Sequence, residues 1–188
     1  VIDEIRYPYG GKLFNMGLLK DTSNSLLNRW KRLKALKKYL SDNQFDYIID
    51  FRFRTKIIQE LLMARWVYDA KTIFTIHSYL INHYIPDNSW LARLMYSHCF
   101  ANVAINNEVK KLVESKHHLK NVVRIYNGIP IAEIQKLAED NFSSNFDYIV
   151  AVGRLDDKVK QFDTLIRCYA SSVLPQKGIH LMFVGEGN

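Results

Sequence analysis

The sequence predicts an α/β protein built on parallel sheets, because two kinds of segment alternate along its 188 residues. Short apolar runs rich in Ile, Val, Phe and Tyr have the length of buried strands, and the segments between them carry apolar residues at helical spacing. Parallel neighbours need a crossover helix, so this alternation favours a parallel sheet covered on both faces. With 48% hydrophobic and 24% charged residues, the composition is that of an ordinary globular chain and excludes dominant disorder.

Residues 1–128 contain four such strands. The first predicted helix carries Leu26, Trp30, Leu33 and Leu40 at a 3.6-residue period and ends near 41–43. The elements that follow are a strand at 47–51, a helix from about 56 to 67, a strand at 72–76, a helix at 89–99, a strand at 102–105, a helix at 108–115 and a strand at 122–126. Successive β-α units of this kind predict a Rossmann-like fold.

A second unit of the same kind begins near residue 146. Residues 127–130 interrupt the pattern, and a helix at 132–140 leads into the polar stretch 141–145. The new elements are a strand at 148–152, a helix at 162–172 and a strand at 180–184. We therefore predict a partial first domain over 1–128, a linker over 129–145 and the opening of a second domain over 146–188. Both Rossmann-like domains are expected to be incomplete, as in a fragment.

Several functional classes are excluded by the sequence. No stretch approaches the roughly 18 apolar residues of a membrane-spanning helix, and residues 1–4 do not begin a signal peptide. Cys99 and Cys168 lack the C-x-x-C spacing of a zinc site and do not suggest a disulfide framework. The histidines are not at metal-ligand spacing either. We expect a cytoplasmic protein with no metal.

The net charge of +7 lies almost entirely in the first half. Residues 1–100 hold 15 basic and 9 acidic side chains, whereas 101–188 hold 11 and 10. Six basic residues fall on the first predicted helix: Arg29, Lys31, Arg32, Lys34, Lys37 and Lys38. Three interpretations stay open for this cluster, namely a solvated helix face, a contact to anionic lipid or glycolipid phosphate, and nucleic-acid binding.

The segment after the strand at 148–152 has the residues of a phosphate site. Gly153 at the strand end permits a sharp turn, and ligands of open α/β sheets bind outside the carboxyl ends of the strands. Arg154 and Lys160 flank this place, and the following helix adds its positive N-terminal end. The alternative is that both cations are solvated charges beside Asp156 and Asp157.

Several motifs of the chain resemble glycosyltransferase family 4. Residues 152–155, 160–166 and 183–187 are similar to the opening of its donor domain, residues 125–129 to its interdomain crossover, and residues 75–78 to a strand end of its acceptor domain. The resemblance covers roughly residues 45–188. It looks most like bacterial enzymes that build lipopolysaccharide or related surface glycans.

The resemblance implies a GT-B fold of two Rossmann-like domains and retaining transfer of a hexosyl-type sugar from a nucleotide diphosphate sugar, with UDP favoured. Arg154 and Lys160 match the basic pair that holds the donor diphosphate, without a metal ion or other cofactor. One extra residue precedes the matched lysine, so Lys158 is the alternative phosphate ligand. We expect this fragment alone to be inactive.

The resemblance also assigns the remaining site residues. His77 matches the catalytic position that faces the transferred sugar, and Asn127 and Gly128 match the crossover. Gly153 and the loop of Gly185, Glu186 and Gly187 match the donor-nucleotide site. The implied acceptor is lipid-linked or an oligosaccharide, at the cytoplasmic face of the inner membrane, with no nucleic-acid partner.

Two rival functions stay open on the sequence. The chain is either a non-catalytic module of the same fold that stabilises a partner enzyme, or a basic RNA-binding α/β protein. The second rival needs aromatic side chains exposed beside the basic cluster, whereas the 11 Tyr and 10 Phe residues sit mostly in apolar elements.

Overall fold

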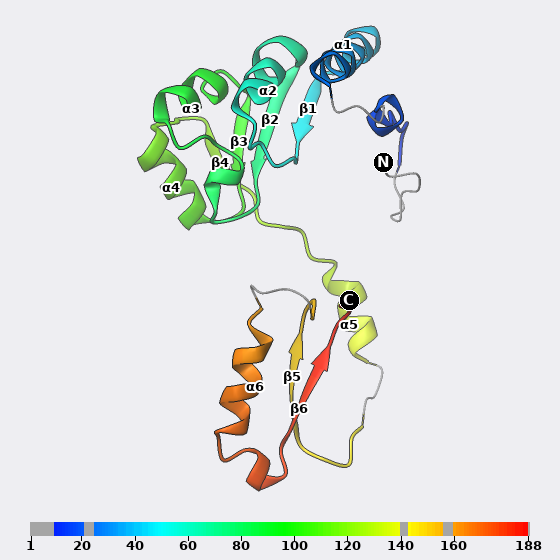
Figure 1. The fold of residues 1–188 in the computed structure, drawn as a ribbon, viewed down its shortest axis with the longest axis vertical. Coiled ribbons are helices and arrows are strands. Elements are labelled where there is room, and N and C mark those ends of the chain that lie inside the picture. The colour runs from blue at the N-terminus through cyan, green and yellow to red at the C-terminus, as the bar shows by residue number, and fades with distance from the viewer. Residues whose placement is uncertain (1–9, 21–24, 140–142, 156–159, 188) are drawn as a thin grey trace. The chain divides into compact units, whose positions relative to one another are not determined.

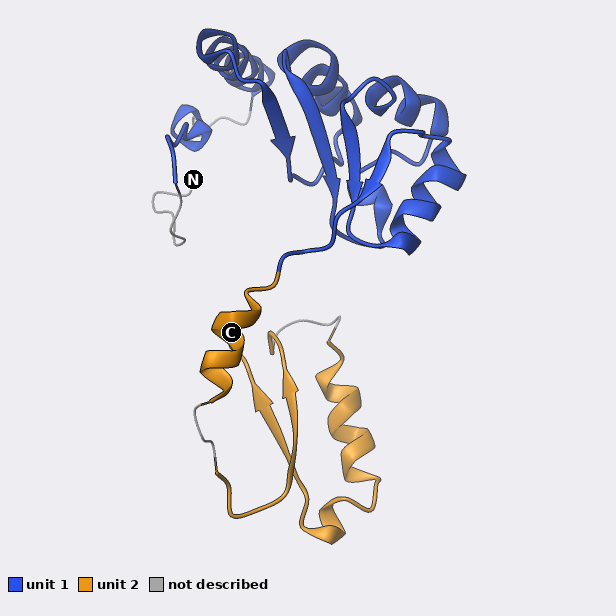
Figure 2. Cartoon of the chain, turned by 180° about the vertical axis from the view of Figure 1, so that it is seen from behind, with its two compact units in different colours: residues 1–128 blue, residues 129–188 orange. Residues whose placement is uncertain are grey.

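The computed structural model describes residues 10–20, 25–139, 143–155 and 160–187. The chain divides into two compact units, Val1–Gly128 and Ile129–Asn188 (Figure 2). Each unit is described by itself.

The first unit contains four strands and four α-helices among its described residues (Figure 1). In chain order these are α1 (Leu26–Asn43), β1 (Tyr47–Asp50), α2 (Ile57–Leu62), β2 (Lys71–Ile76), α3 (Ser89–Tyr96), β3 (Ala101–Ala104), α4 (Asn107–His117) and β4 (Val122–Arg124). The predicted helix at 56–67 is divided, because a π-helical turn, Met63–Val67, continues α2. The predicted order of elements is otherwise confirmed.

The four strands form one parallel sheet in the order β1-β2-β3-β4. The core packs on one face of this sheet, where Phe74 and Ile76 of β2 and Val122 of β4 meet buried side chains of α3 and α4. Each strand pairs with its neighbour in sequence, and crossovers of one hand then place every connecting helix on the same face.

The opposite face of the sheet is buried at its centre, where Thr75 and Val103 are 4% and 9% exposed, but the prediction that both faces are covered fails at the edge strands. Ile49 of β1 and Val123 of β4 point to this face and are 53% and 43% exposed. Within the described residues, no helix packs on them. The sequence pattern could not show this, because it gives the strands but not their order.

Helix α1 packs on the core side through a separate apolar cluster. Leu40 meets Met63 and Val67 of the π-helical turn, with Leu33 and Leu36 packed against them. The Ser25 hydroxyl accepts a hydrogen bond from the Asn28 N–H and caps the start of this helix.

The second unit contains α5 (Ile131–Ala138), β5 (Tyr148–Val152), α6 (Phe162–Ala170) and β6 (His180–Val184) (Figure 1). The two strands pair in parallel over their full length, and α6 lies in the crossover between them. None of the described side chains of this unit is fully buried. Among the described residues of the whole chain, no helix is long and apolar enough to cross a membrane.

Candidate functional site

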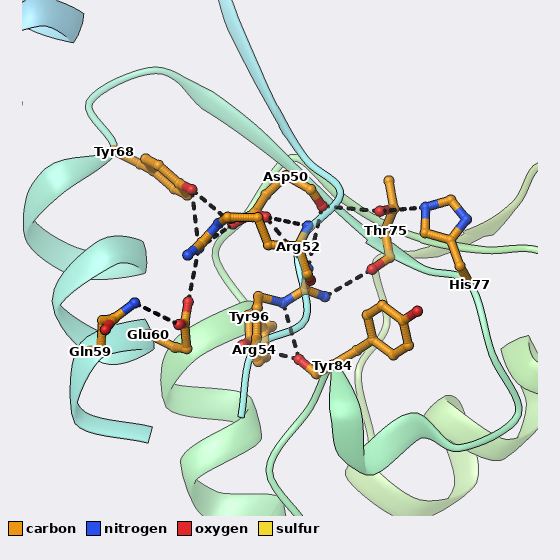
Figure 3. A network of polar contacts seen from close by, with 10 residues as sticks. All are labelled: Asp50, Arg52, Arg54, Gln59, Glu60, Tyr68, Thr75, His77, Tyr84 and Tyr96. Carbon is orange, nitrogen blue, oxygen red and sulfur yellow. Dashed lines mark hydrogen bonds and ion pairs between the residues drawn. The ribbon is translucent and has the colours of Figure 1, made fainter. Parts of the chain in front are cut away.

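A polar network lies at the carboxyl ends of β1 and β2 (Figure 3). Arg52 is its centre, because its Nη2 donates to Asp50 Oδ2 at 2.7 Å and to Glu60 Oε2 at 2.8 Å. The Tyr68 hydroxyl donates to the same Asp50 oxygen at 2.8 Å. The Asp50 and Glu60 side chains are buried, whereas 41% of the Arg52 side chain is exposed. One half-exposed cation therefore bridges two buried carboxylates.

The two carboxylates respond differently to this setting. Burial acts to raise the pKa of Asp50, but the hydrogen bonds and charge of Arg52 outweigh it and hold that pKa below its usual value. Burial raises the pKa of Glu60, and Arg52 offsets this only in part. Burial disfavours the charged Arg52, yet its hydrogen bond with Asp50 and the nearby acids raise its pKa. Arg52 and Asp50 therefore stay ionised at neutral pH.

Arg54 fixes the loop that follows β1. Its side chain is 1% exposed, and its guanidinium donates to the carbonyl oxygens of Thr75 at 2.9 Å and Tyr84 at 3.0 Å. It also donates to the carbonyls of Asp50 and Arg52, at 3.3 and 3.2 Å. Arg54 thereby ties the end of β1 to β2 and to the segment around Tyr84 (Figure 3).

His77 follows β2 at the edge of this network. Its Nε2 lies 2.8 Å from Thr75 Oγ1, and the Thr75 hydroxyl donates to the Asp50 carbonyl oxygen at 3.0 Å. A hydroxyl has a single hydrogen, so the Thr75 oxygen must accept from His77. The neutral His77 ring is therefore assigned as the tautomer with its proton on Nε2, and Nδ1 carries the lone pair.

The His77 ring is held by its neighbours. It stacks on Phe51, with ring centroids 5.5 Å apart and planes 22° from parallel, and Tyr84 packs edge-on. Within the part of the chain that the structure describes, His77 Nδ1 has no hydrogen-bond partner, and the side chain is half-buried. An oriented ring with an available acceptor nitrogen suits a ligand hydroxyl.

Of the residues in this network, His77 was predicted as a site residue from the sequence, whereas Asp50, Arg52, Arg54 and Glu60 were not. The available signal was the alternation of Asp50, Arg52 and Arg54 immediately after an apolar strand. Charges at a strand end normally indicate solvent exposure, and only the structure shows that most of this group is buried.

The second unit brings the glycines of the predicted donor site together. Past the strand ends, the Gly153 N–H donates to the Val184 carbonyl at 3.0 Å, and the Leu155 N–H donates to the Glu186 carbonyl at 2.9 Å. A Cβ atom on Gly185 would collide with the Gly153 carbonyl oxygen. The two loops therefore lie backbone against backbone, which requires glycine at 185.

Lys160 lies over the same loops. A Cβ atom on Gly153 would meet Lys160 Cε at 3.3 Å and Phe162 Cζ at 3.2 Å. Gln161 has a φ of 49°, a left-handed conformation that turns the chain from Lys160 into α6. The structure thus places Gly153, Gly185, Lys160 and the start of α6 together, with the exposed Arg154 in the same loop. Lys158, like Asp156 and Asp157, lies outside the described residues.

The other predicted residues fall elsewhere. Asn127 and Gly128 are exposed in the segment between β4 and α5, and Glu186 and Gly187 follow β6. Within the described ranges, no group of three His, Cys, Asp or Glu side chains is placed to hold a metal ion.

The basic cluster lies on α1. Trp30 stacks on Trp66 with ring centroids 5.0 Å apart, and Lys34 Nζ and Lys37 Nζ lie 5.7 Å and 4.3 Å from the Trp30 and Trp66 ring centres. Lys38 pairs with Asp42 at 2.7 Å. Two lysine ammonium groups of this helix therefore lie over aromatic rings, and within the described ranges the pair with Asp42 is the one ion pair that neutralises a cation of α1.

Parallel sheets with candidate ligand groups at the carboxyl ends of their strands define a Rossmann-like α/β protein. The comparison with known proteins is more specific. The family model described as Glycosyltransferase Family 4 matches residues 8–133. The chain therefore belongs to glycosyltransferase family 4, which confirms the resemblance found in its motifs.

A solved structure supports the fold. The chain is similar to the crystal structure of a glycosyltransferase from Rickettsia africae ESF-5, with a TM-score of 0.50 and 15% sequence identity. The match covers 88% of this chain and 53% of that one, so the chain spans about half the length of the solved protein. This likeness confirms the predicted Rossmann-like fold class of the GT-B type. No curated protein matches the sequence.

Proposed function

We propose that the chain is part of a retaining hexosyltransferase that moves a sugar from a nucleotide diphosphate sugar to a growing lipopolysaccharide or another surface glycan. A UDP-sugar is the favoured donor. The observation that carries the proposal is the pair of glycine loops after β5 and β6, where Gly185 packs on the Gly153 backbone beneath Lys160. Membership of glycosyltransferase family 4 supports the reaction class.

In this proposal the donor diphosphate binds at the glycine loops. Lys160 and Arg154 neutralise it, and the N–H groups at the start of α6 add a positive dipole. When the bond between the anomeric carbon and the diphosphate oxygen breaks, negative charge builds on the leaving nucleotide, and the same groups stabilise it without a metal ion. Lys158 remains the alternative ligand in place of Lys160.

His77 is the proposed contact to the transferred sugar. Thr75 holds the proton of the neutral ring on Nε2, so Nδ1 accepts a hydrogen bond from a sugar hydroxyl. This contact would fix the orientation of the sugar.

The test of the donor site is a calorimetric titration of the purified chain with UDP, ADP and uridine. We expect UDP to bind and uridine, which lacks the diphosphate, to bind far more weakly. Equal affinity for UDP and ADP would show that the base is not selected in this chain. Equal affinity for UDP and uridine would contradict a diphosphate site.

A peripheral position on the cytoplasmic face of the inner membrane is the second part of the proposal. The excess of basic residues on α1 supports it, since each basic residue near an anionic surface contributes about 1 kcal/mol. Neutralising Lys31, Arg32, Lys34, Lys37 and Lys38 is expected to weaken sedimentation with phosphatidylglycerol liposomes. Unchanged sedimentation would contradict it.

A further inference from the structure

An apolar groove of about 890 Å³ lies between the first half of α1 and residues 55–62, outside both sites described above. Its walls are formed by Leu26, Leu27 and Trp30 on one side and by Ile57, Ile58 and Leu62 on the other. Leu26, Leu27 and Ile58 are 79%, 74% and 78% exposed. A contiguous exposed apolar surface indicates a binding site, whereas apolar residues exposed singly do not.

The groove exists because the apolar stripe of α1 is longer than the surface that covers it. Leu33, Leu36 and Leu40 pack against the π-helical turn after α2. The same stripe continues toward the start of the helix as Leu26 and Trp30. There it faces α2 across the groove, and its exposure shows that no described residue covers it.

The rim of the groove is positively charged. Arg29 and Lys56 line it, and Arg29 is half-buried whereas Lys56 is exposed. The acids nearest to Lys56 in sequence, Glu60 and Asp50, both pair with Arg52, and Asp21, the acid nearest to Arg29, lies outside the described residues. Among the described residues, no ion pair neutralises Arg29 or Lys56. An apolar groove with cations at its rim fits an amphiphile that has a hydrocarbon chain and an anionic head group.

We propose that this groove binds a lipid phosphate, with its hydrocarbon chain between α1 and α2 and its phosphate at Arg29 and Lys56. The inference rests on the proposed function and selects a lipid-linked acceptor over a free oligosaccharide. A sugar chain needs many hydrogen-bonding partners, and Thr55 and Gln59 are the neutral polar residues that the groove walls offer.

The groove is also linked to the His77 site. Thr55 directly follows Arg54, whose guanidinium binds the Thr75 carbonyl. One short segment after β1 therefore contributes to the groove wall and to the network that orients His77. A lipid phosphate in the groove would contact the same loop that leads to the proposed sugar site.

The test uses decyl phosphate below its micelle concentration, titrated calorimetrically into the chain. Wild type is expected to bind decyl phosphate but not inorganic phosphate. Replacing both Leu27→Asn and Ile58→Asn is expected to weaken binding by about tenfold, because these side chains form the apolar walls. The matched control is Leu137→Asn on α5, where the leucine is 70% exposed. Thermal unfolding checks that each variant is folded.

The phosphate contact is tested separately. Arg29→Gln and Lys56→Gln are each expected to weaken decyl phosphate binding by about fivefold, whereas Lys111→Gln on α4 leaves it unchanged. Unchanged binding in the Leu27→Asn, Ile58→Asn variant would overturn the proposal. Binding to vesicles of equal parts phosphatidylcholine and phosphatidylglycerol, but not to decyl phosphate, would overturn it in favour of a bilayer surface. A dimer in sedimentation that the same variant dissociates would overturn it in favour of a second copy of the chain.

A parallel UDP titration separates this inference from the proposed function. If the wild-type chain binds UDP but not decyl phosphate, the groove proposal alone is refuted. If the wild-type chain binds decyl phosphate but not UDP, the donor site is refuted, while the groove stands.

Discussion

Thr75 Oγ1 lies 2.8 Å from His77 Nε2, and the same hydroxyl donates to the Asp50 carbonyl oxygen 3.0 Å away. Thr75 is 4% exposed, so water does not compete for its single hydrogen. A buried threonine thus determines which nitrogen of a half-buried histidine carries the proton. Thr75 therefore leaves the Nδ1 lone pair available for the proposed hydrogen bond from a sugar, although Thr75 itself is not proposed to contact a ligand.

The tautomer of His77 is the first prediction. In wild type at alkaline pH, nitrogen-15 correlation spectra are expected to show the proton of His77 on Nε2. Thr75→Val removes the hydroxyl acceptor at nearly constant volume, and we expect both tautomers to be populated in exchange. Thr75→Ser keeps the hydroxyl and should keep the wild-type spectrum. A proton on Nδ1 in wild type would refute the assignment.

The close approach of Gly185 to Gly153 gives the second prediction. Gly185→Ala forces the loops after β5 and β6 apart, because the new Cβ would collide with the Gly153 carbonyl. We expect a loss of about 1–3 kcal/mol in the stability of the second unit, measured by hydrogen exchange of the β5 and β6 amides. Gly128→Ala is the control, since a Cβ there meets nothing within 4 Å. Equal exchange rates in the two variants would contradict the packing.

The ion pair between Asp50 and Arg52 gives the third prediction. Asp50 has a pKa below its unfolded value of about 3.9, so the stability it contributes is present above that pH and is lost as the pH falls through the folded pKa. Asp50→Asn is expected to cost about 3 kcal/mol at neutral pH, the lower end for a buried pair because Arg52 is 41% exposed. In urea unfolding, the stability of the Asp50→Asn variant should also fall less steeply than that of wild type as the pH drops through the acidic range.

The pH dependence that Glu60 gives to the stability has the opposite sign to that of Asp50. The pKa of Glu60 is raised, so its contribution to stability is largest when it is protonated and falls as the pH rises through the folded pKa.

Asp42→Asn is the matched control for Asp50→Asn, because the Asp42 carboxylate is 56% exposed and its pair with Lys38 should contribute less than about 1 kcal/mol. If Asp50→Asn were as mild as Asp42→Asn, the network would not stabilise the fold.

The sequence predicted the elements well where apolar runs have clear ends. The strands at 148–152 and 180–184 have the predicted bounds, because each is a short apolar run followed by glycine. The exposure of Ile49 and Val123 on the edge strands of the first sheet was not predictable, since it follows from strand order and not from any local pattern.

The site was predictable only where a motif carried it. The glycines and Lys160 followed from a family resemblance, yet the contact between Gly153 and Gly185 depends on the pairing of strands about 30 residues apart. Arg54 gave no usable signal, because its partner carbonyl at Tyr84 belongs to a distant segment. Periodicity predicts which residues face a core, but it does not predict which buried charged side chain donates a hydrogen bond to which carbonyl oxygen.

The most direct test of the central claim is calorimetric titration of UDP into wild type, Arg154→Ala, Lys158→Ala and Lys160→Ala, with Lys177→Ala as a control of equal charge in the same unit. We predict that Arg154→Ala and one of the two candidate lysine variants lose about tenfold or more in affinity, while Lys177→Ala binds as wild type does. UDP affinity that is the same in all five proteins, or no UDP binding by a folded wild-type chain, would contradict a donor diphosphate site at the glycine loops.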